Sequence, residues 1–418
     1  MADATPTRVP KGSKEIGESG TRIINGFITG EEYNQDLRGR RMYEIYEEMR
    51  RGNATIKAML SSVKLPIASA TWSVQPASDD PTDVEAAALV EANLTEVLNF
   101  QSVLNEALTH LDFGFAVFEK CWGVEQIDGK WRVVLSKLAF RKQTTVYKWE
   151  TEDGKPGITQ MNAMGKTFSI PASKLLVITN AQEGENYEGV SILRPAYQSW
   201  YIINQLYKID AIGHERQALG VVDVQYPKGA SDKDIRKVER LARNVRANEE
   251  AYISHPEGWS VGFMDMKAHT LKDIGPSVSH HNRQITLSAM AQWLMIGAEN
   301  GSGTRSAGED QSSMFELANQ AVANNIASDF NSQVIKQLVD LNFNVSAYPR
   351  LVVSRVGREN LKELADTFKT LVDAGGITPY EQDEEFLRKL MHLPMPQEEN
   401  EAKTTTNLST GEKKPTQT

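Results

Sequence analysis

The stretch "GAENGSGTRSAGE" (297–309) is rich in glycine, serine and threonine, a composition that could cradle phosphate groups. A phosphate-binding loop needs the pattern G-x-x-x-x-G-K-[ST], in which the lysine reaches the phosphates and the hydroxyl holds magnesium. Counted from Gly297, the sixth position is Ser302, and the stretch contains no lysine. A G-x-G begins at Gly301, but Ser306 stands where the third glycine of G-x-G-x-x-G is required. Because the stretch also follows a predicted helix and not a strand, we predict no nucleotide site.

Other residues that could do chemistry lack the spacing that chemistry requires. His280 and His281 are adjacent, with no H-E-x-x-H around them, and neighbours on a helix point apart, so a polar helix face is favoured over a metal site. The single cysteine, Cys121, excludes an intrachain disulfide and a Cys-rich zinc site, and its aromatic surroundings favour a buried small apolar side chain. No carboxylate pair stands out. The residues therefore predict no catalytic, cofactor or metal site.

Three arginines, Arg236, Arg240 and Arg243, share one face of a helix predicted within residues 231–251. A solvated face paired with Glu239 and its neighbours is the favoured interpretation, because charged runs are usually solvated. The alternative is a docking surface for an acidic partner.

The composition excludes several classes of protein. The chain has 418 residues, of which 40% are hydrophobic and 24% charged, as in globular proteins with a real core. A formal net charge of −9 disfavours a protein that coats nucleic acid. No apolar run approaches the ~20 residues that span a bilayer, and the polar N-terminus lacks a signal peptide's apolar segment. We therefore expect a soluble protein made in the cytoplasm, without a membrane partner.

The first half of the chain predicts an α+β domain over about residues 54–180. Apolar residues recur at helical steps over 83–112, and Gly114 ends that helix. A strand-rich region follows, with Asp128-Gly129 as a hairpin turn. The stretch 168–179 is predicted to form one strand that closes the sheet.

The second half alternates long helices with a small mixed segment. An apolar stripe predicts a helix that ends near Leu219, and 220–274 then predicts strand, helix and strand. A helix over 275–296, the glycine-rich loop and a long helix over about 310–342 follow. Near the C-terminus we expect a helix that stops at glycines and another capped by Thr378.

Two motifs and the order of these parts resemble the portal proteins of tailed bacteriophages, in particular the Mu-like branch. The first motif is a strand with Gly114, Phe115, Glu119 and Trp122. The second is "YEGVSILRPAY", with Tyr187, Gly189, Ser191, Leu193, Arg194, Pro195, Ala196 and Tyr197. The resemblance covers about residues 25–395.

The resemblance implies an α+β portal-type fold with an α+β wing, a helical stem, a small α/β clip and a short helical crown, assembled into a ring. On this chain the parts would be a disordered arm (1–24), the wing (25–189), a stem helix (190–219), the clip (220–274), a second stem helix (275–296), the tunnel loop (297–309), a wing helix and return (310–354), the crown (355–396) and a disordered tail (397–418).

The implied function is a non-enzymatic ring, with twelve subunits in the family, at the capsid vertex of the virion. Double-stranded DNA would be packaged and ejected through it without sequence specificity. The terminase packaging motor, the head–tail adaptor and the capsid or scaffold protein would be its partners, with Arg236, Arg240 and Arg243 in the clip. The loop residues facing DNA would be Glu299, Asn300, Gly301, Ser302, Gly303, Thr304 and Arg305. Another virion or adaptor protein is the alternative, and a nucleic-acid enzyme is less favoured because no metal or phosphate motif is present.

Overall fold

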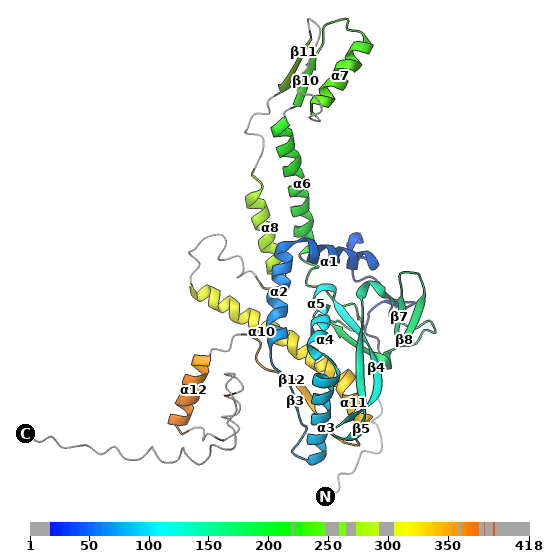
Figure 1. Ribbon diagram of the computed structural model, residues 1–418, viewed down its shortest axis with the longest axis vertical. Coiled ribbons are helices and arrows are strands. Elements are labelled where there is room, and N and C mark those ends of the chain that lie inside the picture. Colours follow the sequence, from blue (N-terminus) through cyan, green and yellow to red (C-terminus); the bar gives the residue numbers. More distant parts are fainter. Residues whose placement is uncertain are drawn as a thin grey trace, which may run out of the picture. The chain divides into compact units, whose positions relative to one another are not determined.

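The computed structural model describes residues 17–219, 221–246, 259–264, 273–291, 305–357 and 361–375, together with Tyr380 and Arg388. The chain divides into two units, 1–356 and 357–418. Figure 1 traces the elements of both units along the chain. Within the described residues, no helix is long and apolar enough to cross a membrane.

The described helices lie in both units. In order they are α1 (Arg40–Gly52), α2 (Ala54–Ser69), α3 (Pro81–Ala92), α4 (Phe100–Ala107), α5 (His110–Phe113), α6 (Tyr197–Leu219), α7 (Asp232–Arg246), α8 (Gly275–Leu287), α10 (Arg305–Phe330), α11 (Lys336–Asp340) and, in the second unit, α12 (Leu361–Asp373). Two π-helical segments, Asn93–Val97 and Asn331–Ile335, follow α3 and α10 directly. Short 3-10 helices span Gln35–Leu37, Gln143–Thr145 and Ala172–Lys174.

The described strands form small antiparallel sheets. They are β1 (Ile23–Ile24), β2 (Phe27–Ile28), β3 (Trp72–Gln75), β4 (Phe115–Ile127), β5 (Lys130–Arg141), β6 (Val146–Lys148), β7 (Gly157–Met161), β8 (Thr167–Pro171), β9 (Leu175–Thr179), β10 (Val221–Gln225), β11 (Ser260–Met264) and β12 (Arg350–Val353). The sheets have the orders β5-β4-β9, β6-β7-β8, β12-β3, β10-β11 and β1-β2. The strand–helix–strand prediction for 220–274 is confirmed by β10, α7 and β11.

The central hairpin is set by its turn. Asp128 and Gly129 both have positive φ, 49° and 75°, as a two-residue hairpin turn requires. They join β4 to β5, which pair from Ile127 and Lys130 to Val117 and Arg141 with one bulge after Cys121. The predicted hairpin is therefore confirmed.

One predicted strand is wrong, because the stretch 168–179 contributes to two sheets. β8 pairs with β7, whereas β9 pairs with β4. Pro171 ends β8 and a 3-10 turn separates the strands. Proline has no backbone N–H for a ladder, so the chain changes sheets there.

The predicted helix over 83–112 is interrupted. Leu98 adopts an extended conformation, with φ −96° and ψ 135°, after the π-helical segment. The side chain of Asn99 then accepts from the amide of Ser102 and starts a new helix. The apolar pattern could not reveal this break, because the buried face continues through it: Leu94, Leu98 and Leu104 are all buried.

The helices around the predicted loop also have different ends. α10 begins at Arg305, about five residues before the predicted start, so residues 305–309 of the loop predicted over 297–309 are helical. α8 ends at Leu287, and Met290 has φ 55°, a value that no helix permits. The helix predicted over 275–296 therefore ends too late: residues 288–291, which the structure still describes, are not helical. Residues 292–304 lie outside the described residues.

The predictions for the chain ends have mixed outcomes. The disordered arm predicted over 1–24 is too long: Ile23–Ile24 form β1, and the amide of Glu185 donates to Thr21 Oγ1 at 3.1 Å. The predicted helix before the glycines is confirmed by α12, and Gly375 follows it with φ 67°. The Thr378 cap and the tail 397–418 lie outside the described residues.

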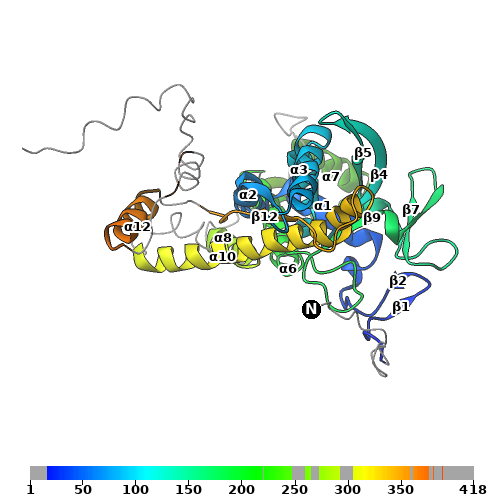
Figure 2. The same cartoon turned by 90° about the horizontal axis from the view of Figure 1, so that it is seen from below.

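The core of the first unit joins both halves of its sequence. Figure 2 shows α10 running along β12 and past α2. Phe100 lies between Trp72 and Phe330, with ring centroids 5.7 and 5.6 Å apart. Phe118 and Met59 are completely buried. The long helix of the second half is therefore part of the domain that the first half builds.

Four side-chain amides close the edges of the sheets. Each donates to the carbonyl and accepts from the amide of one strand residue, with all eight distances between 2.7 and 3.2 Å. The pairs are Asn93–Leu135 and Asn342–Val133 on β5, Gln333–Val177 on β9, and Asn331–Leu351 on β12. We call them amide clamps. Because β5, β9 and β12 are all edge strands, the clamps satisfy backbone groups that would otherwise template another strand.

The clamp of Asn93 should stabilise the domain measurably. Asn93 is 1% exposed, so Asn93→Leu leaves the buried N–H and C=O of Leu135 without partners. The expected loss is about 2–4 kcal/mol of unfolding free energy, measured by denaturant titration. The exposed Asn344→Leu is the matched control and should change stability by less than about 0.5 kcal/mol. Equal effects of the two substitutions would contradict the role of the clamp.

Candidate functional site

The two motifs quoted from the sequence meet in space at the start of α6. Gly114 ends α5 with φ 97°, and its carbonyl accepts from the amide of Asn180 at 2.7 Å. A Cβ at Gly114 would lie 2.2 Å from the carbonyl oxygen of Glu188. Any side chain at Gly114 would therefore push the second motif away from the sheet.

Gly189 makes the reciprocal approach. Its φ is 56°, and a Cβ there would lie 2.3 Å from the carbonyl oxygen of Asn180 and 2.7 Å from that of Gly114. Each glycine thus packs against the backbone that carries the other. We call this close approach the glycine contact.

The residues after Gly189 fasten the chain before α6 begins. The hydroxyl of Ser191 donates to the carbonyl of Asp112 at 2.6 Å and accepts from the amide of Leu193 at 3.0 Å. Arg194 forms an ion pair with Glu32, with Nη2 2.8 Å from Oε1. Although partial burial opposes it, hydrogen bonding to Arg194 lowers the pKa of Glu32. These bonds set the direction in which α6 leaves the domain.

A charged cluster lies beneath the same junction. The Asp112 side chain is 1% exposed, and Lys64 Nζ lies 2.6 Å from its Oδ1, while Arg50 Nη1 lies 3.0 Å from its Oδ2. Burial lowers the pKa of Lys64, and the neighbouring Asp112 opposes this shift. Removing one member would leave an uncompensated buried charge, so the cluster stabilises the junction as a unit.

Glu188 is the one acid of the second motif. Burial raises the pKa of Glu188, and its carboxyl accepts hydrogen bonds from Trp149 Nε1, at 3.3 Å, and from Tyr43. A buried acid with a raised pKa can mark a catalytic site. Here its partners are an indole and a phenol of the core, with no nucleophile, and no group of three metal-ligating side chains occurs among the described residues. The buried Glu188 carboxyl therefore helps to pack the second motif against the core.

The paired helices α6 and α8 carry apolar side chains that one subunit leaves exposed. On α6 they are Tyr201, Tyr207, Ile209 and Ile212, and Leu287 is similarly exposed on α8. Between the helices, His281 Nδ1 lies 3.3 Å from Ser199 Oγ, and the rings of His280 and His281 are in edge contact. The predicted polar role of the two histidines fits this position.

The helix α7 presents the predicted arginines. Val238 is buried against β10, whereas Arg236 and Arg240 are exposed. Their predicted pairing with Glu239 is not found among the described side chains, and Arg236 Nε instead donates to the carbonyl of Asp232 at 3.3 Å. Arg243 also lies on α7, with its side chain outside the described part. The structure thus places the three on one helix without a carboxylate partner for the two that are described.

The predicted loop residues are placed only at one end. Glu299, Asn300, Gly301, Ser302, Gly303 and Thr304 lie outside the described residues. Arg305 is the first residue of α10, so its prediction as a loop residue is wrong.

Cys121 and its neighbours in the first motif have structural partners. Cys121 is half-buried and not fully buried as predicted; it lies beside the β-bulge at which Ser136 of β5 is left unpaired. Glu119 is paired with Arg141 across the hairpin. Sequence reasoning missed Lys120, a buried lysine whose Nζ donates to the carbonyl of Gln333 at 2.7 Å. A lysine in an apolar strand was the only available signal.

The fold of this chain is similar to that of a chain in the neck of a solved particle, and a weaker similarity is found to a phage portal protein. A chain from the neck of an empty gene transfer agent (GTA) particle, computed with C6 symmetry, has a TM-score of 0.51 at 12% identity, over 84% of this chain and 94% of that chain. An HK97 family phage portal protein from Corynebacterium diphtheriae has a TM-score of 0.43 at 13% identity, over 75% of this chain and 95% of that chain.

The family follows from the sequence. The family model for the portal protein of Mu bacteriophage matches residues 43–393, and the chain belongs to that family. The predicted family and the portal-type α+β fold are confirmed, and the chain has a portal role at the capsid vertex. In this chain, the glycine contact joins the α+β domain to α6, the helix that leaves it.

His110, next to the glycine contact, should make stability depend on pH. It is fully buried, and burial lowers the pKa of its imidazole to about 4. Between pH 6.5 and 4 the unfolded state binds the proton and the folded state does not, so stability falls as the pH falls, by about 3 kcal/mol in all. Denaturant titrations across this range should show a shallower pH dependence for His110→Leu than for the parent protein. Parallel curves would contradict the assignment.

Proposed function

We propose that this chain assembles by one repeated head-to-tail contact into a closed ring of the virion, through which double-stranded DNA passes in both directions. The family match carries the proposal. The exposed apolar side chains of α6 support it, because Ile209 and Ile212 are 62% and 48% exposed in one subunit and would be covered by a neighbour. The family is a structural one, and we propose that the ring moves DNA with a separate motor and has no enzymatic activity.

We further propose that the stretch 297–304 is the tunnel loop. Glycine and serine allow a loop to adjust to a duplex of any sequence, since they add little bulk and permit many backbone conformations. DNA carries one charge per ~1.7 Å of axis, so a strongly basic wall would hold it. A chain of net charge −9 with one arginine beside the loop would not. These features suit a conduit better than a binding protein.

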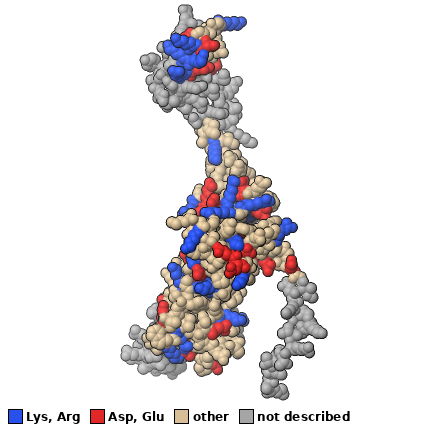
Figure 3. Space-filling view, turned by 90° about the vertical axis from the view of Figure 1, so that its right-hand side faces the viewer, with Lys and Arg blue, Asp and Glu red and all other residues tan. Residues whose placement is uncertain are grey.

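The segment with β10, α7 and β11 is proposed as the clip. The sequence of α7 contains six lysines and arginines against three acids, a local excess of three positive charges in an acidic chain. Figure 3 shows basic side chains grouped, with acidic ones beside them, over this segment. Complementary charge mainly accelerates and orients docking. We infer that α7 meets acidic surfaces of the packaging motor and later of the head–tail adaptor.

Stiffening the loop should impair DNA packaging without preventing assembly. Gly301→Val with Gly303→Val removes backbone conformations that β-branched residues cannot adopt. Negative-stain microscopy should first show rings of one size, and packaged DNA per particle should then fall severalfold. Ala298→Val adds the same side chain without removing a glycine and should package normally. Normal packaging by the double variant would refute the tunnel-loop assignment, and a parent protein that never forms rings would refute the portal assembly.

Reversing charge on α7 should weaken docking. Arg236→Glu with Arg240→Glu changes two exposed side chains, so rings should still form. Affinity for the packaging motor should fall about tenfold at low salt and less at high salt, because exposed charges are screened. Lys155→Glu with Lys174→Glu makes the same charge change in the wing and is the control. If both double variants bind the motor equally well, the arginines form a solvated face and not a docking surface.

A further inference from the structure

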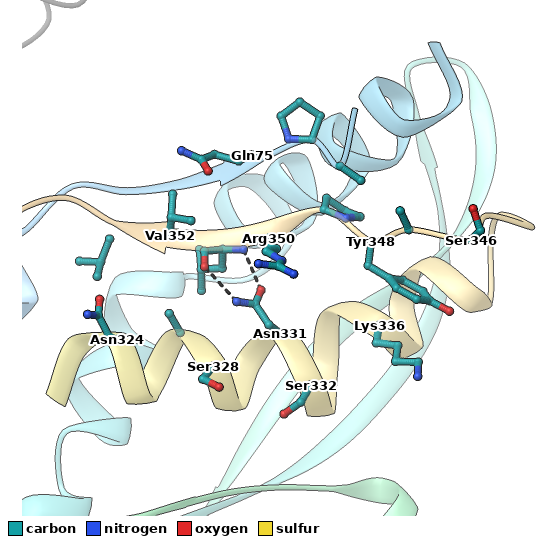
Figure 4. A pocket seen from close by; sticks show the side chains of 17 residues that line it. Gln75, Asn324, Ser328, Asn331, Ser332, Lys336, Ser346, Tyr348, Arg350 and Val352 are labelled. Carbon is teal, nitrogen blue, oxygen red and sulfur yellow. Dashed lines mark hydrogen bonds between the residues drawn. The ribbon is translucent and has the colours of Figure 1, made fainter. Parts of the chain in front are cut away.

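A groove with a volume of about 1030 Å³ lies between the end of α10 and the two-stranded sheet β12-β3 (Figure 4). One wall is a row of polar side chains at four-residue steps, Asn324, Ser328, Ser332 and Lys336, all exposed. The opposite wall includes Gln75, Ser346, Tyr348 and Arg350. The groove therefore offers amides, hydroxyls and two cations along its length.

Among the described residues that line this groove there is no aspartate or glutamate. The chain as a whole has 55 acidic and 46 basic residues, so a groove whose described lining holds two cations and no acid runs against its composition. Lys336 Nζ lies 5.4 Å from the ring centroid of Tyr348, whose hydroxyl donates to Asp340 at 2.8 Å. Among the described ion pairs, none includes Lys336 or Arg350. Both cations are available to an anionic ligand.

The clamp of Asn331 decides what kind of ligand can bind. Its amide already occupies the outward N–H and C=O of Leu351, so an incoming strand cannot pair with β12 there. Pro76 and Pro349, which also line the groove, have no N–H to offer. Strand pairing at Leu351 is therefore excluded, so the choice of ligand must come from its side chains, and the charges that the groove offers them are positive.

We propose that this groove binds an extended acidic peptide segment of another protein, with carboxylates at Lys336 and Arg350. Serine and asparagine side chains on the α10 wall would hydrogen-bond to the peptide backbone. A pocket of this size accommodates a short peptide. Duplex DNA fits poorly, because two phosphate contacts give a salt slope of only about −1.8, as in weak non-specific binding.

The test is direct binding to the full-length protein. A labelled octapeptide of alternating glutamate and glycine should bind, in fluorescence anisotropy, about tenfold more tightly than the same peptide with glutamine. Lys336→Gln with Arg350→Gln should abolish that preference. Arg40→Gln with Lys57→Gln removes two exposed cations of α1 and α2 and should preserve it.

A second measurement needs no variant. Carbodiimide coupling of the bound acidic peptide to the parent protein should join it to Lys336, as identified by mass spectrometry. The proposal is overturned if the acidic and glutamine peptides bind equally, if the groove variant keeps the preference, if coupling occurs elsewhere, or if a short DNA duplex displaces the peptide from the groove. These outcomes do not depend on ring formation, so they are separate from the portal assignment.

Discussion

The glycine contact is the constraint on which the domain's main joint depends. Most of the sheet lies between Gly114 and Gly189 in sequence. A Cβ at Gly114 would nevertheless lie 2.2 Å from the carbonyl oxygen of Glu188, and a Cβ at Gly189 would lie 2.7 Å from the carbonyl oxygen of Gly114. Such short approaches leave no room for adjustment by side-chain movement, because the opposing atoms are backbone. The start of α6 is therefore fixed by main-chain packing, and Ser191 and Arg194 secure it.

The amide clamps and the two π-helical segments act together. Asn93 begins one π-helix, and Asn331 and Gln333 belong to the other. A π-helix inserts an extra residue into a turn and so changes which side chains face the sheet. The wider turn brings Asn331 to β12 and Gln333 to β9 from a single helix, while Lys120 binds the carbonyl of Gln333. The π-helical segment at the end of α10 thus covers the edge strands of two sheets, β12 and β9.

The amide clamps also bear on how copies of the chain assemble. A protein that stands beside many copies of itself must not let edge strands pair at random, and the clamps occupy the strand positions that would invite this. Apolar surface is instead exposed on α6, where helices of neighbouring subunits can pack. In the proposed ring, helix packing rather than strand addition would therefore determine how subunits meet.

The sequence by itself determined the elements that depend on local chemistry. Asp128-Gly129 specifies its hairpin turn because both positions require positive φ, and helical periodicity predicted α6, α7 and α12. The portal family followed from two motifs and the order of parts. The sequence did not reveal why those motifs matter, that 168–179 divides between two sheets, or where the buried helix 83–112 breaks. Only the tertiary structure decided these points, because the partners are remote: Gly114 needs the backbone near residue 188, and Asn93 and Asn331 need strands about 42 and 20 residues away. Local propensity acts within a turn of helix or a pair of strands, whereas contacts of this kind exist only once the chain has folded.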